Sequence, residues 1–186
     1  MMSSLPHPPA LLTDLSRLPE IYALRVAAWE QSPGAQYVNR ELFPQGWSDA
    51  LDTHATARHW VVEDGGRIVA AARVVLLDTV EETGQPNFTR FDLPLGRPFC
   101  YYSRLVMLPI YRKTGLSLLF DQVRMAYLRN TETAFAIATT NYKRLPDLLN
   151  LGWTHFGDMP FVANNSAPQL ASPLCLWQPN ALLASS

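Results

Sequence analysis

The segment Leu108-Pro109-Ile110-Tyr111-Arg112-Lys113-Thr114-Gly115-Leu116-Ser117 decides the fold of this chain. It joins a predicted strand, Phe99 to Leu108, to a predicted helix, Gly115 to Arg129, whose apolar residues recur at helical spacing. A strand that turns directly into a helix points several free backbone N–H groups outward, and the helix dipole adds partial positive charge there. The segment therefore predicts an anion site, although many helices begin with Gly and a basic residue for structural reasons alone.

The residues of this turn indicate which kind of anion the site would bind. Gly115 lets a ligand approach the backbone closely, while Arg112 and Lys113 add positive charge. The Gly-x-Gly-x-x-Gly spacing of a dinucleotide fingerprint is absent, and no Gly-Lys-Ser/Thr follows as in a P-loop. The turn is therefore predicted to bind a phosphate group by a motif of another class.

Strands and helices alternate on both sides of this turn, which predicts an α/β (α+β) fold: a single domain with a central mixed, twisted sheet of about six to seven strands and helices on both faces. Asp64-Gly65-Gly66 supplies the positive backbone angles of a hairpin turn, and Asp78–Pro98, which has no periodicity, is predicted as a long loop. The other predicted elements are the strands Ala10–Thr13, His59–Glu63, Arg67–Leu77, Ala134–Thr139, Gly152–Gly157 and Pro173–Gln178, the helices Pro19–Gln31 and Tyr142–Leu151, and a short helix at Ser48–Asp52 capped by Ser48.

The composition excludes several classes of protein. The 186 residues include 15 basic and 16 acidic side chains, a balance that argues against nucleic-acid binding by phosphate neutralisation. No apolar run approaches a membrane span and no export signal is found, so we expect a cytoplasmic protein that does not bind membranes. Cys100 and Cys175 lie in apolar runs and are predicted to be buried thiols. We expect loose tails at residues 1–9 and 179–186 around a domain of residues 10–178. The residues do not determine whether the chain forms a homodimer.

Two motifs in this chain resemble those of the GNAT superfamily of acetyltransferases. The acyl-CoA motif of that family, Gln/Arg-x-x-Gly-x-Gly/Ala after the fourth strand, is matched by Arg112-Lys113-Thr114-Gly115-Leu116-Ser117, with Ser117 departing at the last small position. Met107-x-Pro109-x-Tyr111-Arg112 is similar to the usual Val-x-Pro-x-Tyr-Arg approach. Asn141 followed by Leu151-Gly152-Trp153 is similar to the helix of the family that follows an Asn and ends in Leu-Gly-Phe. The resemblance extends from about Ala10 to Gln178.

This resemblance implies a binding mode for coenzyme A. The backbone amides of Arg112, Lys113, Thr114, Gly115, Leu116 and Ser117 would hold its pyrophosphate. The backbone of Leu105, Val106 and Met107 would pair with pantetheine and polarise the thioester carbonyl, and Asn141 would contact the pantetheine arm. The implied co-substrate is acetyl-CoA or another acyl-CoA, the acceptor is a small-molecule or peptide amine, and no metal is implied.

The residues that would move protons are less evident. Many family members have a Tyr that protonates the departing thiolate, and Leu148 occupies that position here. Tyr102 and Tyr142 are the candidate catalytic residues, with Tyr101 and Tyr111 as alternatives, although a Tyr on an alternating strand is more often a packed aromatic residue. The long loop contains four candidate general bases, Asp78, Glu81, Glu82 and Asp92. Acidic residues in a loop are usually solvated and have no catalytic role.

A second group of residues resembles the layout of the acyl-homoserine-lactone synthases, which share the GNAT core. It consists of Arg25, Trp29, Asp49, Asp52, Arg73 and Ser103-Arg104. Those enzymes carry Glu-x-x-Arg in the fourth strand, where this chain has Tyr101 in place of the Glu. Arginines among apolar residues need carboxylate partners, here Asp49, Asp52 or Glu30, so the group is predicted to form an ion-pair network that could also recognise a substrate. His54 and His59 fit no familiar metal spacing and are predicted to be solvated or hydrogen-bonded imidazoles.

Three hypotheses of function follow. The first is an N-acetyltransferase that moves acetyl from acetyl-CoA to a primary amine by direct attack on the thioester. The second is transfer of a longer acyl chain from coenzyme A or a carrier protein, as an autoinducer synthase does. The third is a non-catalytic module that binds acyl-CoA or a partner protein, motivated by Leu148 and by the lack of a carboxylate in the fourth strand.

Overall fold

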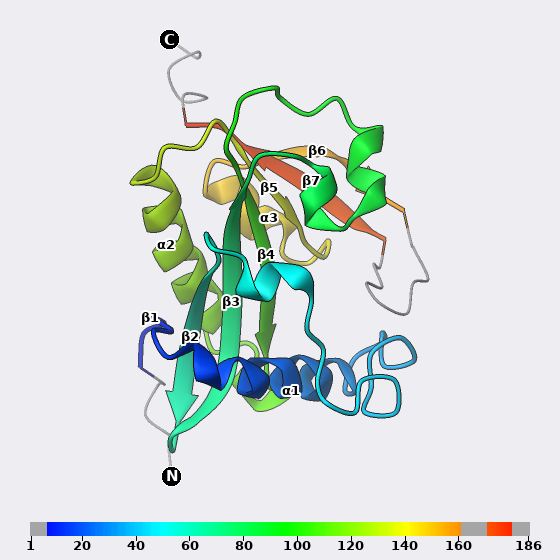
Figure 1. The fold of residues 1–186 in the computed structure, drawn as a ribbon, viewed down its shortest axis with the longest axis vertical. Coiled ribbons are helices and arrows are strands. Elements are labelled where there is room, and N and C mark those ends of the chain that lie inside the picture. The colour runs from blue at the N-terminus through cyan, green and yellow to red at the C-terminus, as the bar shows by residue number, and fades with distance from the viewer. Residues whose placement is uncertain (1–6, 161–170, 180–186) are drawn as a thin grey trace.

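A computed structural model of the chain describes residues 7–160 and 171–179, so residues 1–6 and 180–186 of the predicted tails lie outside it. The strands form one mixed sheet in the order β1-β2-β3-β4-β5-β7-β6 (Figure 1). Its seven strands agree with the predicted number. They are β1 (Ala10–Leu11), β2 (Arg58–Asp64), β3 (Arg67–Leu77), β4 (Phe99–Met107), β5 (Ala136–Thr139), β6 (Thr154–Met159) and β7 (Ser172–Trp177).

Helices cover both faces of the sheet, as predicted. Figure 1 shows α1 (Leu18–Trp29) crossing one face, while α2 (Leu116–Arg129) and α3 (Leu145–Asn150) lie on the other. Ile21 and Leu24 of α1 pack against Ala71 and Val106. Phe120, Met125 and Leu128 of α2 and Leu148 of α3 are all buried on the opposite face. The short 3-10 helices are η1 (Leu15–Arg17), η2 (Ala50–Thr53), η3 (Glu81–Thr83), η4 (Pro86–Arg90) and η5 (Pro109–Tyr111).

The segment of residues 78–98 differs from the predicted long loop. It contains η3 and η4, and Figure 1 shows both near one end of the sheet. Helices of three and five residues are too short to produce a recognisable periodicity in sequence. Phe88 of η4 is fully buried in what we call the second core. The second core consists of Leu51, Val75, Leu77, Phe88, Leu93, Phe99, Tyr101, Phe135, Ile137, Met159, Leu174 and Leu176.

Strands β4 and β5 form the parallel pair of the sheet. They pair only from Cys100 to Tyr102, opposite Ala136 to Ala138. Beyond this point the β5 side of β4, from Ser103 to Met107, has no strand partner among the described residues, and we call it the open edge of β4. A bulge lies here, because Arg104 and Leu105 together face the single position between Ala71 and Arg73 of β3.

Other local predictions are confirmed. The turn between β2 and β3 uses Gly65 and Gly66, both with positive φ. Cys100 and Cys175 are buried free thiols, and burial raises the pKa of Cys100 to about 12 and that of Cys175 to about 11. Within the described part of the chain, none of the helices has the length and apolar character needed to cross a membrane.

Candidate functional site

The turn before α2 presents a row of free backbone donors. The amide of Arg112 donates to the Pro109 carbonyl at 3.1 Å, but no acceptor is found among the described residues for the amides of Lys113 to Ser117. We call these five residues the phosphate turn. Lys113 and Gly115 both have positive φ, 64° and 84°, and a Cβ placed on Gly115 would meet no atom within 4 Å. The turn is therefore open to a ligand and presents amides that the helix itself cannot satisfy.

The two basic residues at this turn have different roles. Nη2 of Arg112 donates to the Ala28 carbonyl near the end of α1 at 2.8 Å, which ties the turn to the opposite layer of the fold. Lys113 and Thr114 are exposed beside it. The positive charge of Arg112 and Lys113 thus stays next to the free amides, a combination that suits a phosphate group.

The open edge of β4 leads toward the phosphate turn. Leu105, Val106 and Met107, the residues expected to pair with pantetheine, form the end of β4, and η5 then connects them to the turn. Val106 faces α1, whereas Leu105 and Met107 pack toward the α2 face. Asn141 lies just beyond β5, and its Oδ1 accepts from the Arg144 amide at 3.0 Å. The structure therefore brings the expected pyrophosphate and pantetheine residues to the same end of the β4–β5 pair.

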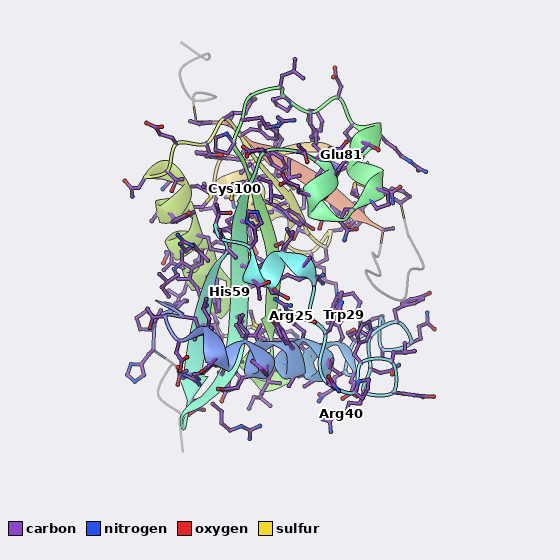
Figure 2. The ribbon with its side chains drawn as sticks, in the orientation of Figure 1. Arg25, Trp29, Arg40, His59, Glu81 and Cys100 are labelled. Carbon is purple, nitrogen blue, oxygen red and sulfur yellow. The ribbon has the colours of Figure 1, made fainter. Side chains whose placement is uncertain are left out.

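The predicted ion-pair network is present, on the α1 face. Arg25 of α1 binds Asp52 with two hydrogen bonds of 2.6 Å, and Figure 2 shows it directed from α1 toward η2. Arg73 donates to both Asp49 and Asp52 at 2.5 Å. Arg104 donates to Asp49 at 2.5 and 2.9 Å. We call these five residues the Asp49 network.

Local structure explains why these carboxylates lie here. Asp49, and not the predicted Ser48, caps η2: its side chain accepts from the Leu51 amide while Asp52 accepts from the Asp49 amide. This capping box holds both carboxylates between Arg25 of α1 and the two arginines of the sheet, Arg73 and Arg104. Glu30, the third predicted partner, pairs with Arg40 instead. The prediction of Ser48 as the cap and of Glu30 as a network partner is therefore wrong.

The charges of the network do not cancel. It contains three arginines and two aspartates, and the side chains of Arg25 and Arg73 are 1% exposed. Burial alone would raise the pKa of Asp49, but Arg104 and Arg73 outweigh burial and hold that pKa well below its usual range. Burial is also the largest cause of the lowered pKa of Arg104, opposed by Asp49 and reinforced by Arg25. One positive charge thus remains in excess, and Arg104, with 15% of its side chain exposed, is the arginine of the network that a ligand can reach, next to Asp49 at 21%.

Aromatic residues surround the exposed end of the network. The Arg104 guanidinium lies 3.9 Å from the centre of the Trp47 ring, and Trp29 meets Trp47 edge to face at 5.4 Å. Gly34 lies so close to Trp29 that a Cβ there would be 2.5 Å from Cζ3 of the ring. Trp29 is therefore part of an aromatic wall beside the network rather than a member of it.

Tyr102, a candidate catalytic residue, lies on the α2 face and is buried. Its hydroxyl donates to Oδ1 of Asp121 at 3.1 Å, and the Arg124 guanidinium lies 3.6 Å from the centre of its ring. Burial raises its pKa well above the ordinary value. Asp121 also pairs with Arg124 and Arg144. This geometry favours the alternative interpretation of Tyr102 as a packed aromatic residue.

The ion-pair cluster around Asp121 was not predicted. Asp121, Arg124 and Arg144 link α2 to the start of α3, with the Asp121 side chain fully buried. Asp121 and Arg124 are three residues apart on the buried side of a helix, and this spacing of opposite charges is the signal that would have identified the pair. Arg144 comes from a separate segment, so its part in the cluster has no local signal.

Tyr142, the other candidate, lies beyond the end of β5 and is 56% exposed. Its hydroxyl donates to Oδ1 of Asp158 at 2.7 Å, and His155 contacts the same oxygen at 3.1 Å. Asp158 is on β6, which lies on the far side of β7 from β5. The Tyr142 hydroxyl is therefore directed away from the open edge of β4.

The remaining candidates have ordinary structural surroundings. The four loop acids Asp78, Glu81, Glu82 and Asp92 are exposed. His59 is buried, with Nε2 2.9 Å from the Asp52 carbonyl, and His54 is hydrogen-bonded to Thr56. Leu148 of α3 is buried. In residues 7–160 and 171–179 no three His, Cys, Asp or Glu side chains gather closely enough to hold a metal ion.

The parallel pair that separates after Tyr102, followed by the phosphate turn and α2, defines the GNAT fold. Solved structures with this fold include BjaI, a CoA-dependent acyl-homoserine lactone synthase, at 15% identity and a TM-score of 0.68 over 95% of this chain and 85% of that chain. FeeM, an N-acyl amino acid synthase from uncultured soil microbes, matches at 12% identity and a TM-score of 0.63 over 93% and 91% of the two chains. A Corynebacterium glutamicum structure described as histone acetyltransferase HPA2 and related acetyltransferase matches at 16% and 0.56 over 93% and 97%. No protein-family model and no curated protein sequence matches the chain.

Proposed function

We propose that this chain is an acyl-CoA-dependent N-acyltransferase whose leading donor is acetyl-CoA. The observation that carries the proposal is the open edge of β4, which continues into five free amides at the start of α2. A thioester of coenzyme A carries a group that fits each part of this site. Its pyrophosphate would accept from the free amides, and the amide groups of its pantetheine arm would pair with the open edge of β4.

The chain would act by positioning the two substrates and by polarising the thioester carbonyl. Backbone N–H groups of β4 near the bulge donate to the thioester oxygen, which favours the negative charge that develops there when an amine attacks. The amine nitrogen forms a bond to the carbonyl carbon, the carbon–sulfur bond breaks, and its electron pair leaves with the sulfur. The amine loses one proton and the thiolate gains one, so the products are an amide and free coenzyme A. The hydroxyls of Tyr102 and Tyr142 are bonded to Asp121 and Asp158, so we assign this proton exchange to water.

We assign the acceptor to the class of amines that carry a carboxylate. The Asp49 network has one more positive than negative charge, and Arg104 is the most exposed of its three arginines. A carboxylate from the acceptor would complete the charge balance and pair with the guanidinium in a fixed geometry. FeeM, one of the structures with this fold, is described as an N-acyl amino acid synthase, which agrees with an acceptor of this class.

A longer acyl donor is the second candidate. It is favoured by the TM-scores of 0.67 and 0.68 to acyl-homoserine lactone synthase structures, one of which contains isopentyl-CoA, against 0.56 for the Corynebacterium acetyltransferase structure. Against this candidate, the second core beside β4 and β5 is filled by large side chains, including the fully buried Phe88, Phe99 and Phe135.

The test is a pair of measurements on the full chain. Acetyl-CoA and coenzyme A should raise the melting temperature, and free thiol should be released from acetyl-CoA in the presence of amino acids above the rate without an acceptor. No thermal shift at millimolar acetyl-CoA would overturn the proposal. A thermal shift without thiol release from any acyl-CoA and amine would instead identify a non-catalytic acyl-CoA-binding module.

A further inference from the structure

Strands β4 and β5 are paired up to Tyr102 and separate after it. We call the last paired positions, Tyr101 and Tyr102 of β4, the closed end of the pair. Tyr101 pairs with Ile137 and Tyr102 with Ala138, and the open edge begins at the next residue. On the proposed function, on which this inference rests, the pyrophosphate lies at the phosphate turn and the pantetheine arm follows the open edge back toward this closed end. Since the acyl group is at the end of coenzyme A farthest from the pyrophosphate, it must lie next to Tyr101 and Tyr102.

The α2 side of this closed end is blocked. The Tyr102 ring is 4% exposed, its hydroxyl is bonded to Asp121, and the Arg124 guanidinium lies against its face. The centre of the Trp153 ring lies 5.1 Å from that of Tyr102. An acyl chain that grew in this direction would have to separate a buried ion pair from its aromatic neighbours.

The other side is closed by an aromatic pair from two separate segments. Phe88 of η4 meets Tyr101 edge to face, with ring centres 5.6 Å apart and an angle of 82° between the rings. Phe88 and Ile137 are fully buried, and Tyr101 is 8% exposed. Behind them the second core continues through Val75, Phe99 and Leu174, all fully buried. This side is therefore also packed, but by apolar side chains that smaller residues could replace.

We propose that Tyr101 and Phe88 limit the length of the acyl group, so that the chain accepts acetyl and rejects longer acyl groups. Protein cores are packed as densely as organic crystals, so an added methylene has no space unless a ring moves. Removing the Phe88 ring leaves a cavity in the second core directly behind Tyr101, and an acyl chain can fill it.

The experiment compares donors of increasing length. The specificity constant, kcat/KM, is measured for acetyl-, butyryl-, hexanoyl- and octanoyl-CoA with one amine acceptor, and the thermal shift is measured for the same thioesters. The wild-type chain should lose roughly 10-fold in kcat/KM for each added methylene. Phe88→Ala should raise the hexanoyl-CoA constant at least 100-fold relative to acetyl-CoA, and hexanoyl-CoA should give it the larger thermal shift.

Phe135→Ala is the matched control. Phe135 belongs to the same second core and is as buried as Phe88, but its ring stacks on Phe99, with ring centres 5.1 Å apart, whereas Phe88 meets the Tyr101 ring. This variant loses the same ring and should keep the wild-type order of donors. Tyr101→Phe, which keeps the ring, should also keep that order, whereas Tyr101→Leu should relax it.

The outcomes separate this inference from the proposed function. Wild-type protein that uses octanoyl-CoA as well as acetyl-CoA would overturn the length limit while leaving the acyltransferase proposal intact, and this result needs no variant to fold. Equal relaxation in Phe88→Ala and Phe135→Ala would also overturn it. Absence of turnover with every thioester would instead contradict the proposed function.

Discussion

The guanidinium of Arg73 donates to Asp52 at 2.5 Å, and both side chains are excluded from solvent, at 1% and 0% exposed. The same nitrogen of Arg73 donates to Asp49, so one arginine from the middle of the sheet holds two carboxylates at η2. The Asp49 network therefore joins the sheet to the segment between α1 and β2.

Replacing Arg73 should cost much of the stability of the fold. Arg73→Met leaves the buried Asp52 and the half-buried Asp49 with fewer partners, and breaking a buried pair in this way costs about 3–5 kcal/mol. Urea unfolding followed by tryptophan fluorescence measures the change. Arg17→Met removes a half-buried surface arginine whose partners, Glu20 and Glu63, are exposed, and as a control it should change the urea midpoint far less. Equal losses in the two variants would contradict a structural role for the network.

Stability should fall in acid because of the same two aspartates. The pKa values of Asp49 and Asp52 are held below that of an unfolded aspartate, about 3.9, so the folded state binds fewer protons than the unfolded state in that range. The stabilisation is fully present above that value and is lost as the pH falls through the lower folded pKa values. In Arg104→Met, Asp49 loses the guanidinium that lowers its pKa most, so its folded pKa moves closer to the unfolded value and the urea midpoint should fall less on acidification than in the wild type. Urea midpoints between pH 7 and pH 3 test this, and coincident curves would refute it.

Blocking the phosphate turn should abolish the binding of coenzyme A. At about 100 times its Kd a ligand adds about 2.7 kcal/mol of stability, which raises the Tm of a chain of this size by roughly 5–10 °C. Gly115→Glu places a carboxylate among the free amides and should remove this shift. Gly84→Glu is a matched control, since Gly84 also has positive φ and open space around its Cα, but it caps η3 in another segment. If Gly115→Glu keeps the full shift, coenzyme A does not bind at this turn.

Arg104 should determine the affinity for the acceptor. A hydrogen bond to a charged group contributes about 1.5–3 kcal/mol, so Arg104→Met should raise the KM of a carboxylate-bearing amine by roughly 10- to 150-fold. The KM of acetyl-CoA should not change. The amide of the same amino acid, which lacks the carboxylate, should be a poor acceptor for wild type and should be affected little by the substitution. A uniform loss for both acceptors would contradict the assignment.

The hydroxyl of Tyr102 should matter for stability and not for turnover. Tyr102→Phe removes a hydrogen bond to the buried Asp121 and should cost about 1 kcal/mol or more. Loss of a general acid would lower kcat by about 10²- to 10⁴-fold, whereas we expect a change of less than about 10-fold. Tyr142→Phe, at an exposed hydroxyl, should change neither quantity greatly. A large fall in kcat with unchanged stability would restore Tyr102 as a catalytic residue.

The order of the elements and the phosphate turn could be predicted because their signals are local. The glycine at 115 and the helical spacing after it lie within one short stretch, as do Gly65 and Gly66 of the hairpin. The members of the Asp49 network were also predictable, since charged residues among apolar neighbours must find partners. Which partners they find depends on tertiary structure, and for this reason Glu30 was assigned wrongly.

The features that the sequence did not reveal depend on contacts between distant segments. The cap of η2 is Asp49 and not Ser48, and Arg73 of β3 and Arg104 of β4 bind the carboxylate of that same Asp49. Arg104 has a positive φ of 58°, a conformation set by the bulge opposite β3 and not by its residue type. The position of Phe88 against Tyr101 has no pattern in the sequence, because a single apolar residue in a 3-10 helix has no periodicity.

The two halves of the proposed site differ in how far apart along the chain their residues lie. The phosphate turn consists of consecutive residues next to α2, whereas Arg104 and Asp49 are 55 residues apart and Arg25 and Asp52 are 27 apart. Contacts between distant residues need closure of long loops and form late when topology limits the folding rate. The residues proposed to bind coenzyme A can therefore assemble from a local segment. The residues proposed to bind the acceptor come together only in a chain whose sheet and first helix have already packed against each other.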